Sequence, residues 1–123
     1  MARSVLTAQT VVRTGLTPSY AAVDSANGEV FDNTYQNLFL HVKNGAGAPI
    51  TVTIGVASTV DGLTVPDLAV VVGAGSEKMI GPFPNNIYGQ ADVDSGIENG
   101  VLIDYSSGTS VTVGLFNRGT INY

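Results

Sequence analysis

The chain has 123 residues, which is enough for one domain with one modest hydrophobic core. It carries ten acidic and five basic residues, and the basic residues are scattered singly, so we expect no nucleic-acid-binding surface. There is no cysteine and only one histidine, which excludes disulfides, thiolate chemistry and a metal site with two histidines from one chain.

The composition favours an all-β fold. Val, Thr and Ile supply 36 residues, whereas Glu and Lys supply only five. β-branched side chains suit a pleated sheet, and strong helix formers are scarce. No window shows the sustained apolar period of an amphipathic helix. The sequence therefore argues against helical bundles and doubly wound α/β folds.

The first part of the chain predicts short extended segments. Residues 1–14 are expected to form a strand or an extended arm, followed by a turn at 15–19. Residues 20–23 suit a short strand, and Asn27–Gly28 can adopt the positive φ angles of a tight turn. The pattern in residues 29–35 favours no single structure.

Two segments in the middle of the chain alternate most clearly between apolar and polar residues. Residues 36–43 and 50–58 are each expected to be strands, and the short loop at 44–49 suggests that they form an antiparallel hairpin. Together with the later strands they predict this core: Leu38, Leu40, Val42, Ile50, Val52, Ile54, Val56, Val101, Ile103, Val111 and Val113.

The rest of the chain continues the pattern of short strands and turns. Strands are expected at 64–72 (an edge strand, because it contains Pro66), 78–80, 101–105 and 109–116, and turns at 61–62, 73–76, 81–86 and 99–100. Residues 117–123 form a polar tail. Turn signals recur closely enough to favour a β-sandwich or jelly-roll-like barrel of about seven or eight antiparallel strands over residues 15–116.

His41 is the first residue to consider for chemistry. It lies in the middle of the 36–43 strand and faces away from Leu40 and Val42. A histidine that acts as a general base needs a nucleophile and an orienting carboxylate nearby, and the sequence places neither. We therefore interpret His41 as a strand histidine that is packed at an interface or solvated.

Two loops have compositions that can bind ions. Asp92, Asp94 and Glu98 lie within seven residues, but Glu98 comes too early for a calcium loop of the EF-hand type, so a solvated acidic loop is expected. Gly73–Ser76 is rich in glycine, but no helix and no Gly-Lys-Ser/Thr motif follows, so a hairpin turn is expected instead of a phosphate site.

The remaining candidate binding features are a proline-containing segment and four aromatic residues. Gly81–Pro84 resembles a polyproline ligand but is better interpreted as a stiff connection between two sheets. Four aromatic residues are spread along the chain and suit packing in or around the core more than stacking on sugars or bases: Tyr88, Tyr105, Phe116 and Tyr123. The sequence thus predicts no catalytic residue, no metal site and no cofactor.

Several turn and strand segments together resemble a family of small virion-associated proteins of tailed phages and prophages. The resemblance covers most of the chain but contains no catalytic motif, and the acidic stretch Asp92–Asn99 departs from the family pattern. The matching segments are Gly15–Tyr20, Leu38–Gly45, Val52–Ile54, Val60–Leu63, Ile80–Pro84, Val101–Tyr105 and Thr109–Phe116.

This resemblance implies a non-enzymatic structural protein, most plausibly a capsid decoration (cement) protein whose partner is the major capsid protein. We expect it to be made in the host cytoplasm, because no signal peptide and no membrane span is visible, and to be located on the virion. A homotrimer suits the three-fold axes of an icosahedral shell, and the arm at residues 2–13 could add as a strand to a neighbour. The alternatives are another virion part, such as a tail, neck or head-fibre protein, or a non-viral carbohydrate-binding module.

Overall fold

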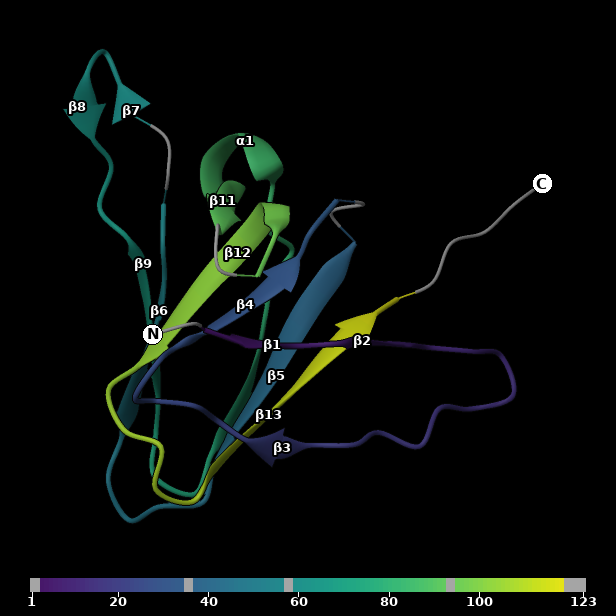
Figure 1. The fold of residues 1–123 in the computed structure, drawn as a ribbon. Helices are drawn as coiled ribbons and strands as arrows, with labels where there is room; N and C mark the ends of the chain where they lie inside the picture. Colours follow the sequence, from purple (N-terminus) through teal and green to yellow (C-terminus); the bar gives the residue numbers. More distant parts are fainter. Residues whose placement is uncertain (1–2, 35–36, 57–58, 93–94, 119–123) are drawn as a thin grey trace.

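The computed structural model describes residues 3–34, 37–56, 59–92 and 95–118. Two β-sheets pack face to face and enclose one hydrophobic core (Figure 1). In the described residues the only helix is α1 (Asn85–Tyr88), a single turn. The prediction of an all-β, sandwich-like fold is therefore confirmed.

The strands divide between the two sheets as follows. Sheet I has the order β1 (Ser4–Val5), β4 (Glu29–Asp32), β12 (Ile97–Tyr105), β6 (Ile50–Ile54), β9 (Leu68–Val72), and β11 (Gln90–Asp92) also pairs with β12. Sheet II has the order β10 (Glu77–Ile80), β5 (Leu38–Asn44), β13 (Val111–Asn117), β2 (Ala8–Thr10), and β3 (Ala21–Ala22) also pairs with β13. A separate ribbon of β7 (Thr59–Val60) and β8 (Leu63–Thr64) extends beyond the sandwich (Figure 1).

The core agrees closely with the alternation in the sequence. Every predicted core residue is buried except Val56, which is half-buried because β6 ends at Ile54. The core also contains Phe31, from the segment whose pattern was ambiguous, and Phe83, from the connection after β10. These two rings pack against each other with centroids 5.8 Å apart.

The predicted hairpin of residues 36–43 with 50–58 is wrong. β5 belongs to sheet II and β6 to sheet I, so the loop between them crosses the sandwich, and the two apolar faces meet across the core instead of side by side. The buried amide of Asn44 stabilises this crossing: its Nδ2 donates to the carbonyl oxygens of Ala48 at 2.9 Å and Val72 at 3.1 Å. The second carbonyl belongs to the end of β9, where Gly73–Ser76 also crosses between the sheets instead of forming the expected hairpin turn.

Several other boundaries differ from the sequence prediction. Asn99–Gly100 lies inside β12, because Gly100 pairs with both β4 and β11, so it is not a turn. The predicted 64–72 strand divides into β8 and β9 on either side of Pro66, although β9 is an edge strand of sheet I, as expected. With several segments divided in this way, the described residues form thirteen mostly short strands instead of seven or eight.

The N-terminal arm pairs with strands of its own chain. β1 lies parallel to β4 at the edge of sheet I, and β2 lies parallel to β13 at the edge of sheet II, so the sheets are mixed instead of purely antiparallel. Leu6, between the two strands, packs against the core. The arm therefore joins the two sheets within one molecule, which differs from the strand addition to a neighbour that we expected.

Candidate binding surface

The side of sheet II that points away from the core carries a cluster of aromatic and ionisable side chains. Alternation along β5 puts Phe39, His41 and Lys43 on this side, and alternation along β13 puts Phe116 there. Phe39 and Phe116 stack with centroids 5.7 Å apart, and Tyr20 packs against Phe116 at the same distance. We call this surface the aromatic face.

His41 lies in the middle of the aromatic face and is 7% exposed. Its Nδ1 is 2.6 Å from the hydroxyl oxygen of Tyr20, and its Nε2 is 3.0 Å from Oε1 of Glu77. The Glu77 carboxylate can only accept, so Nε2 carries a proton and donates it, and in the neutral ring Nδ1 accepts from Tyr20. His41 is thus a packed strand histidine, as the sequence indicated.

The row of Tyr20, His41 and Glu77 contains a hydroxyl, an imidazole and a carboxylate in the order that nucleophilic catalysis uses. Both ring nitrogens of His41 are engaged within the chain. The histidine of a catalytic triad is hydrogen-bonded in the same way, so these two bonds fit packing and catalysis equally. The Lys43 ammonium also lies 4.0 Å from the centroid of the Tyr20 ring, and this cation–π contact holds the ring in place. Together these contacts hold the side chains of Tyr20, His41 and Glu77 in one arrangement on the aromatic face.

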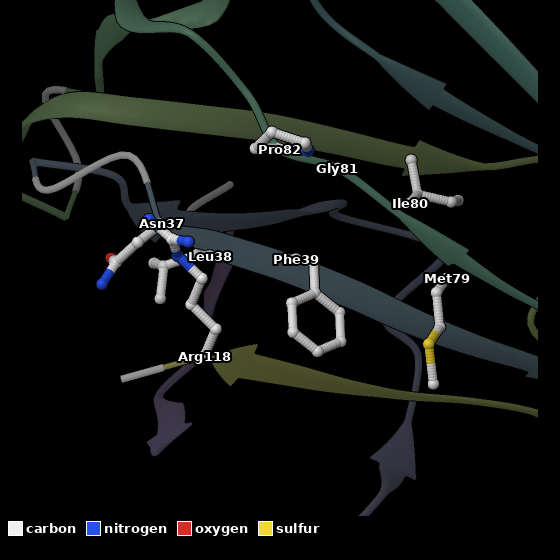
Figure 2. Close-up of a pocket in the computed structure, with 8 residues that line it drawn as sticks. All are labelled: Asn37, Leu38, Phe39, Met79, Ile80, Gly81, Pro82 and Arg118. Carbon is white, nitrogen blue, oxygen red and sulfur yellow. The ribbon is translucent and has the colours of Figure 1, made fainter. Parts of the chain in front are cut away.

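A groove of about 530 Å³ opens at one end of the aromatic face, beside strands β5 and β10 (Figure 2). Its walls are mainly apolar, with one cation among them, and include Leu38, Phe39, Met79, Ile80, Pro82 and Arg118. Met79 is 67% exposed, which is unusual for such a large apolar side chain. In Figure 2, Met79 and Arg118 lie at opposite ends of the groove, with Phe39 between them.

The groove depends on a close approach of two backbones. Gly81 has a φ of 145°, and a Cβ atom there would lie 2.9 Å from the Cβ of Phe39 and 3.1 Å from the carbonyl oxygen of Leu38. Only glycine allows the chain to pass β5 this closely. From here, Gly81–Pro84 leads from sheet II towards α1 and sheet I, so the interpretation of this segment as a connection between the sheets is confirmed.

Of the three carboxylates in the acidic loop, the structure describes those of Asp92 and Glu98. Asp92 ends β11 and accepts a hydrogen bond from the Ser95 hydroxyl at 2.7 Å, whereas Glu98 is exposed on β12. Asp94 lies outside the described residues. Within the part of the chain that the structure describes, no three His, Asp or Glu side chains are grouped closely enough to hold a metal ion.

The four aromatic residues that the sequence singled out have separate environments. Tyr88 packs edge-on against Phe83, with centroids 5.7 Å apart, and Tyr105 is buried in the interior. Phe116 is buried within the aromatic face, and Tyr123 lies outside the described residues. The three described rings therefore serve packing, as predicted. The cluster of Tyr20, Phe39, His41 and Phe116 was not predicted from the sequence, although the alternation in β5 and β13 contained part of the signal.

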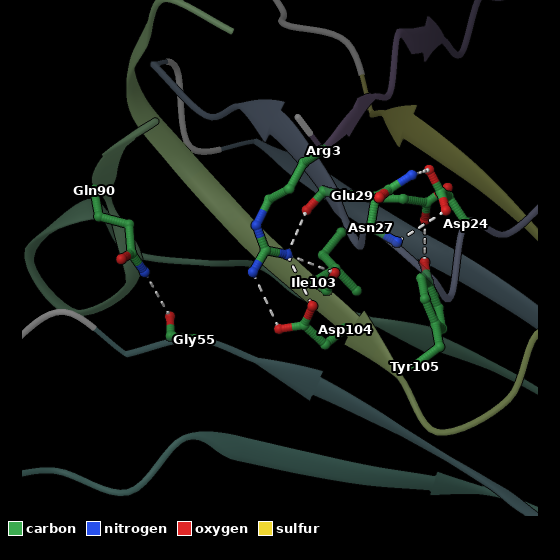
Figure 3. Close-up of polar contacts among 9 residues, drawn as sticks. All are labelled: Arg3, Asp24, Asn27, Glu29, Gly55, Gln90, Ile103, Asp104 and Tyr105. Carbon is green, nitrogen blue, oxygen red and sulfur yellow. Dashed lines mark hydrogen bonds and ion pairs between the residues drawn. The ribbon is translucent and has the colours of Figure 1, made fainter. Parts of the chain in front are cut away.

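A buried acid–phenol pair lies at the other side of the molecule, in sheet I (Figure 3). Glu29 is 2% exposed and accepts a hydrogen bond from the Tyr105 hydroxyl. Burial raises the pKa of the Glu29 carboxyl, and the hydrogen bond from Tyr105 offsets part of this increase. Burial, followed by the neighbouring Glu29 charge, also raises the pKa of Tyr105.

The raised pKa of Glu29 predicts how stability changes with pH. The folded state holds the Glu29 proton more tightly than the unfolded state does. The protonated carboxyl therefore contributes its full stabilisation to the folded state below the ordinary pKa of 4.5, and this stabilisation is lost as the pH rises above that value. Glu29→Gln keeps an acceptor for Tyr105 but cannot ionise. We expect the variant to be more stable than the wild type at pH 7 and equal to it at pH 4, as measured by urea unfolding.

The exposed Glu98→Gln variant controls for the change in net charge. It should not reproduce the difference between the two pH values. If Glu29→Gln changed the unfolding free energy equally at pH 4 and pH 7, the assignment of a buried carboxyl with a raised pKa would be wrong.

Among the residues that the structure describes, no helix is long and apolar enough to cross a membrane. Comparisons of the chain with protein-family models, with curated proteins and with solved structures find no match. The function has to be inferred from the sequence pattern and from the chemistry of the surface.

Proposed function

We propose that the protein is a non-enzymatic structural protein of a phage particle that binds the outer surface of the capsid and stabilises it. The observation that carries this proposal is the exposed apolar groove beside the aromatic face, whose side chains are held by contacts with one another. Its walls offer Met79 and Phe39 for contact with another protein. Apolar and aromatic side chains with few charges are typical of the buried centre of protein–protein interfaces.

The internal hydrogen bonds of the aromatic face are those of a rigid surface, which suits a binding role. Tyr20, His41 and Glu77 satisfy one another, and Lys43 covers the Tyr20 ring. A surface whose side chains are held in this way binds a partner with little loss of conformational entropy. The resemblance of most of the sequence to small virion-associated phage proteins supports the same conclusion and indicates the partner class, a major capsid protein.

A trimer is the oligomer that this role favours. A small domain offers roughly 800 Å² to a partner at an interface of standard size. Three linked copies at a three-fold position of the shell contact equivalent coat subunits with one interface sequence. Linking the copies raises their effective concentration, so the whole assembly binds more tightly than one domain does.

A carbohydrate-binding module is the second candidate, because the aromatic face does bring several rings together on one surface. Phe116 and His41 are buried, however, and the rings of Tyr20 and Phe39 are already in contact with Lys43 and Phe116. Sugar binding needs an open ring face. Saturable binding to a panel of glycans, lost in Phe39→Ala, would favour this alternative over the capsid.

Adding the purified protein to particles that lack it tests the proposal. We expect the protein to co-sediment with the particles in saturable amounts and to raise the temperature at which the shells release their DNA. Met79→Glu should reduce this binding, because it places a charge on the apolar groove, whereas Lys78→Glu on the neighbouring exposed position is the control. Absence of co-sedimentation by the folded wild-type protein would contradict the proposal.

A further inference from the structure

The β7–β8 ribbon carries two large apolar side chains that contribute nothing to the core. Val60 is 62% exposed and Leu63 is 72% exposed, and they pair across the ribbon. Between them, Asp61 and Gly62 form the turn with φ angles of 51° and 78°. Asp and Gly tolerate such angles well, so these two residues suit the turn. We call Val60–Leu63 the tip.

The tip and the groove on sheet II are complementary in composition. The tip presents two aliphatic side chains on either side of a carboxylate, and the groove presents apolar walls with the Arg118 guanidinium at one end. The groove volume of about 530 Å³ is in the range that accommodates a small ligand, roughly 300–1,000 Å³, so it is large enough for a Val and a Leu side chain. An Asp61–Arg118 pair would fix the orientation of the tip.

We propose that the tip of one copy of this chain inserts into the groove of a second copy. The inference rests on the self-association included in the proposed function. A groove filled by a neighbour's tip is not open to the capsid, so the aromatic face beside it would then contact the shell, and Met79→Glu would weaken association between copies as well as capsid binding. The ribbon extends from the β6–β9 side of sheet I, whereas the groove lies on sheet II beside β5 and β10 (Figure 1). Each copy therefore offers its tip to one neighbour and its groove to another, and a head-to-tail contact of this kind forms a closed trimer when it rotates each copy by a third of a turn relative to the next.

Charge variants at both surfaces test the contact without disturbing the core, because Asp61 and Arg118 are exposed. Asp61→Asn keeps a residue that tolerates a positive φ and removes the charge. Arg118→Glu replaces the proposed attraction to Asp61 of the neighbouring copy by repulsion. Asp61→Lys combined with Arg118→Glu restores the pair with its signs exchanged. Leu63→Ser removes the apolar contact of the tip, and the exposed Ile87→Ser on α1 is its control.

Light scattering over a range of protein concentrations measures association. We expect the wild type to reach three times the mass of one chain, Arg118→Glu and Leu63→Ser to weaken association by about tenfold or more, and Asp61→Asn to weaken it less. The exchanged pair should recover most of the loss, and Ile87→Ser should match the wild type. Circular dichroism checks that each variant keeps its β structure.

The outcomes separate this inference from the proposed function. A wild-type protein that is a strict monomer, or an oligomer that none of these variants affects, would overturn the tip-in-groove contact, even if the protein binds capsids. Conversely, an association that responds to the exchanged pair as described would support the contact, even if no particle binds the protein.

Discussion

Phe83→Ala is expected to lower the free energy of unfolding by about 3–5 kcal/mol. Phe83 is 1% exposed, and its ring packs between Phe31 and Tyr88. Truncation removes this burial and leaves a cavity that the surrounding residues fill only partly, because neighbouring strands fix their backbones. Although the residue belongs to a connection, its energetic role is that of a core residue.

Urea unfolding followed by tyrosine fluorescence measures this loss. Phe39→Ala is the matched control, because the same side chain is removed from the half-buried aromatic face, and a loss of less than about 2 kcal/mol is expected there. If Phe83→Ala cost no more than Phe39→Ala, the connection would not be part of the core.

Deletion of residues 2–13 is expected to destabilise the isolated domain by about 3 kcal/mol or more. The deletion removes backbone hydrogen bonds on both sheets, including Leu6 to Val30 at 2.9 Å and Val11 to Asn117 at 2.8 Å. It also removes Leu6, which packs against the core, and the strand partners that β1 and β2 provide to β4 and β13. Each hydrogen bond contributes about 1 kcal/mol net, and the half-buried Leu6 adds to this total.

Arg3→Ala tests one contact of the arm separately. Its guanidinium donates to the carbonyl oxygen of Ile103 and to the Asp104 carboxylate, both at 3.0 Å (Figure 3). The exposed Arg13→Ala is the control for loss of a positive charge. Thermal unfolding of all three proteins should rank the deletion as most destabilising, Arg3→Ala as intermediate and Arg13→Ala as close to the wild type. A deletion that unfolds at the wild-type temperature would mean that the arm does not join the sheets in solution.

The alternation of apolar and polar residues was sufficient to predict the longer strands and most of the core. It worked best at Ile50–Ile54, where one face of the strand is buried and the other is half-buried. At Leu38–Val42 it identified the face that points into the core, although His41 on the opposite face is buried as well. Alternation identifies the buried face of a strand, but not whether the next strand lies beside it or across the core. The loop between these two strands is compatible with either arrangement, and the amide of Asn44, which selects the crossing, carries no signal that the sequence alone reveals.

The candidate surface was harder to predict, because its residues come from distant parts of the chain. Tyr20, His41 and Glu77 are 21 and 36 residues apart and meet only because β3 and β10 lie on opposite sides of β5 and β13 in sheet II. The burial of Phe31 could not be predicted either. Its strand β4 is flanked by polar residues and does not alternate between apolar and polar positions.

The number of copies of this chain in purified phage particles tests the central claim most directly. Particles released by the organism that encodes the chain can be purified, and the chain quantified against the major capsid protein by mass spectrometry. A decoration protein occupies equivalent positions over the whole shell, so we expect on the order of hundreds of copies per particle. Absence of the chain from the particles, or about a dozen copies or fewer, as at a single neck or tail position, would contradict the account.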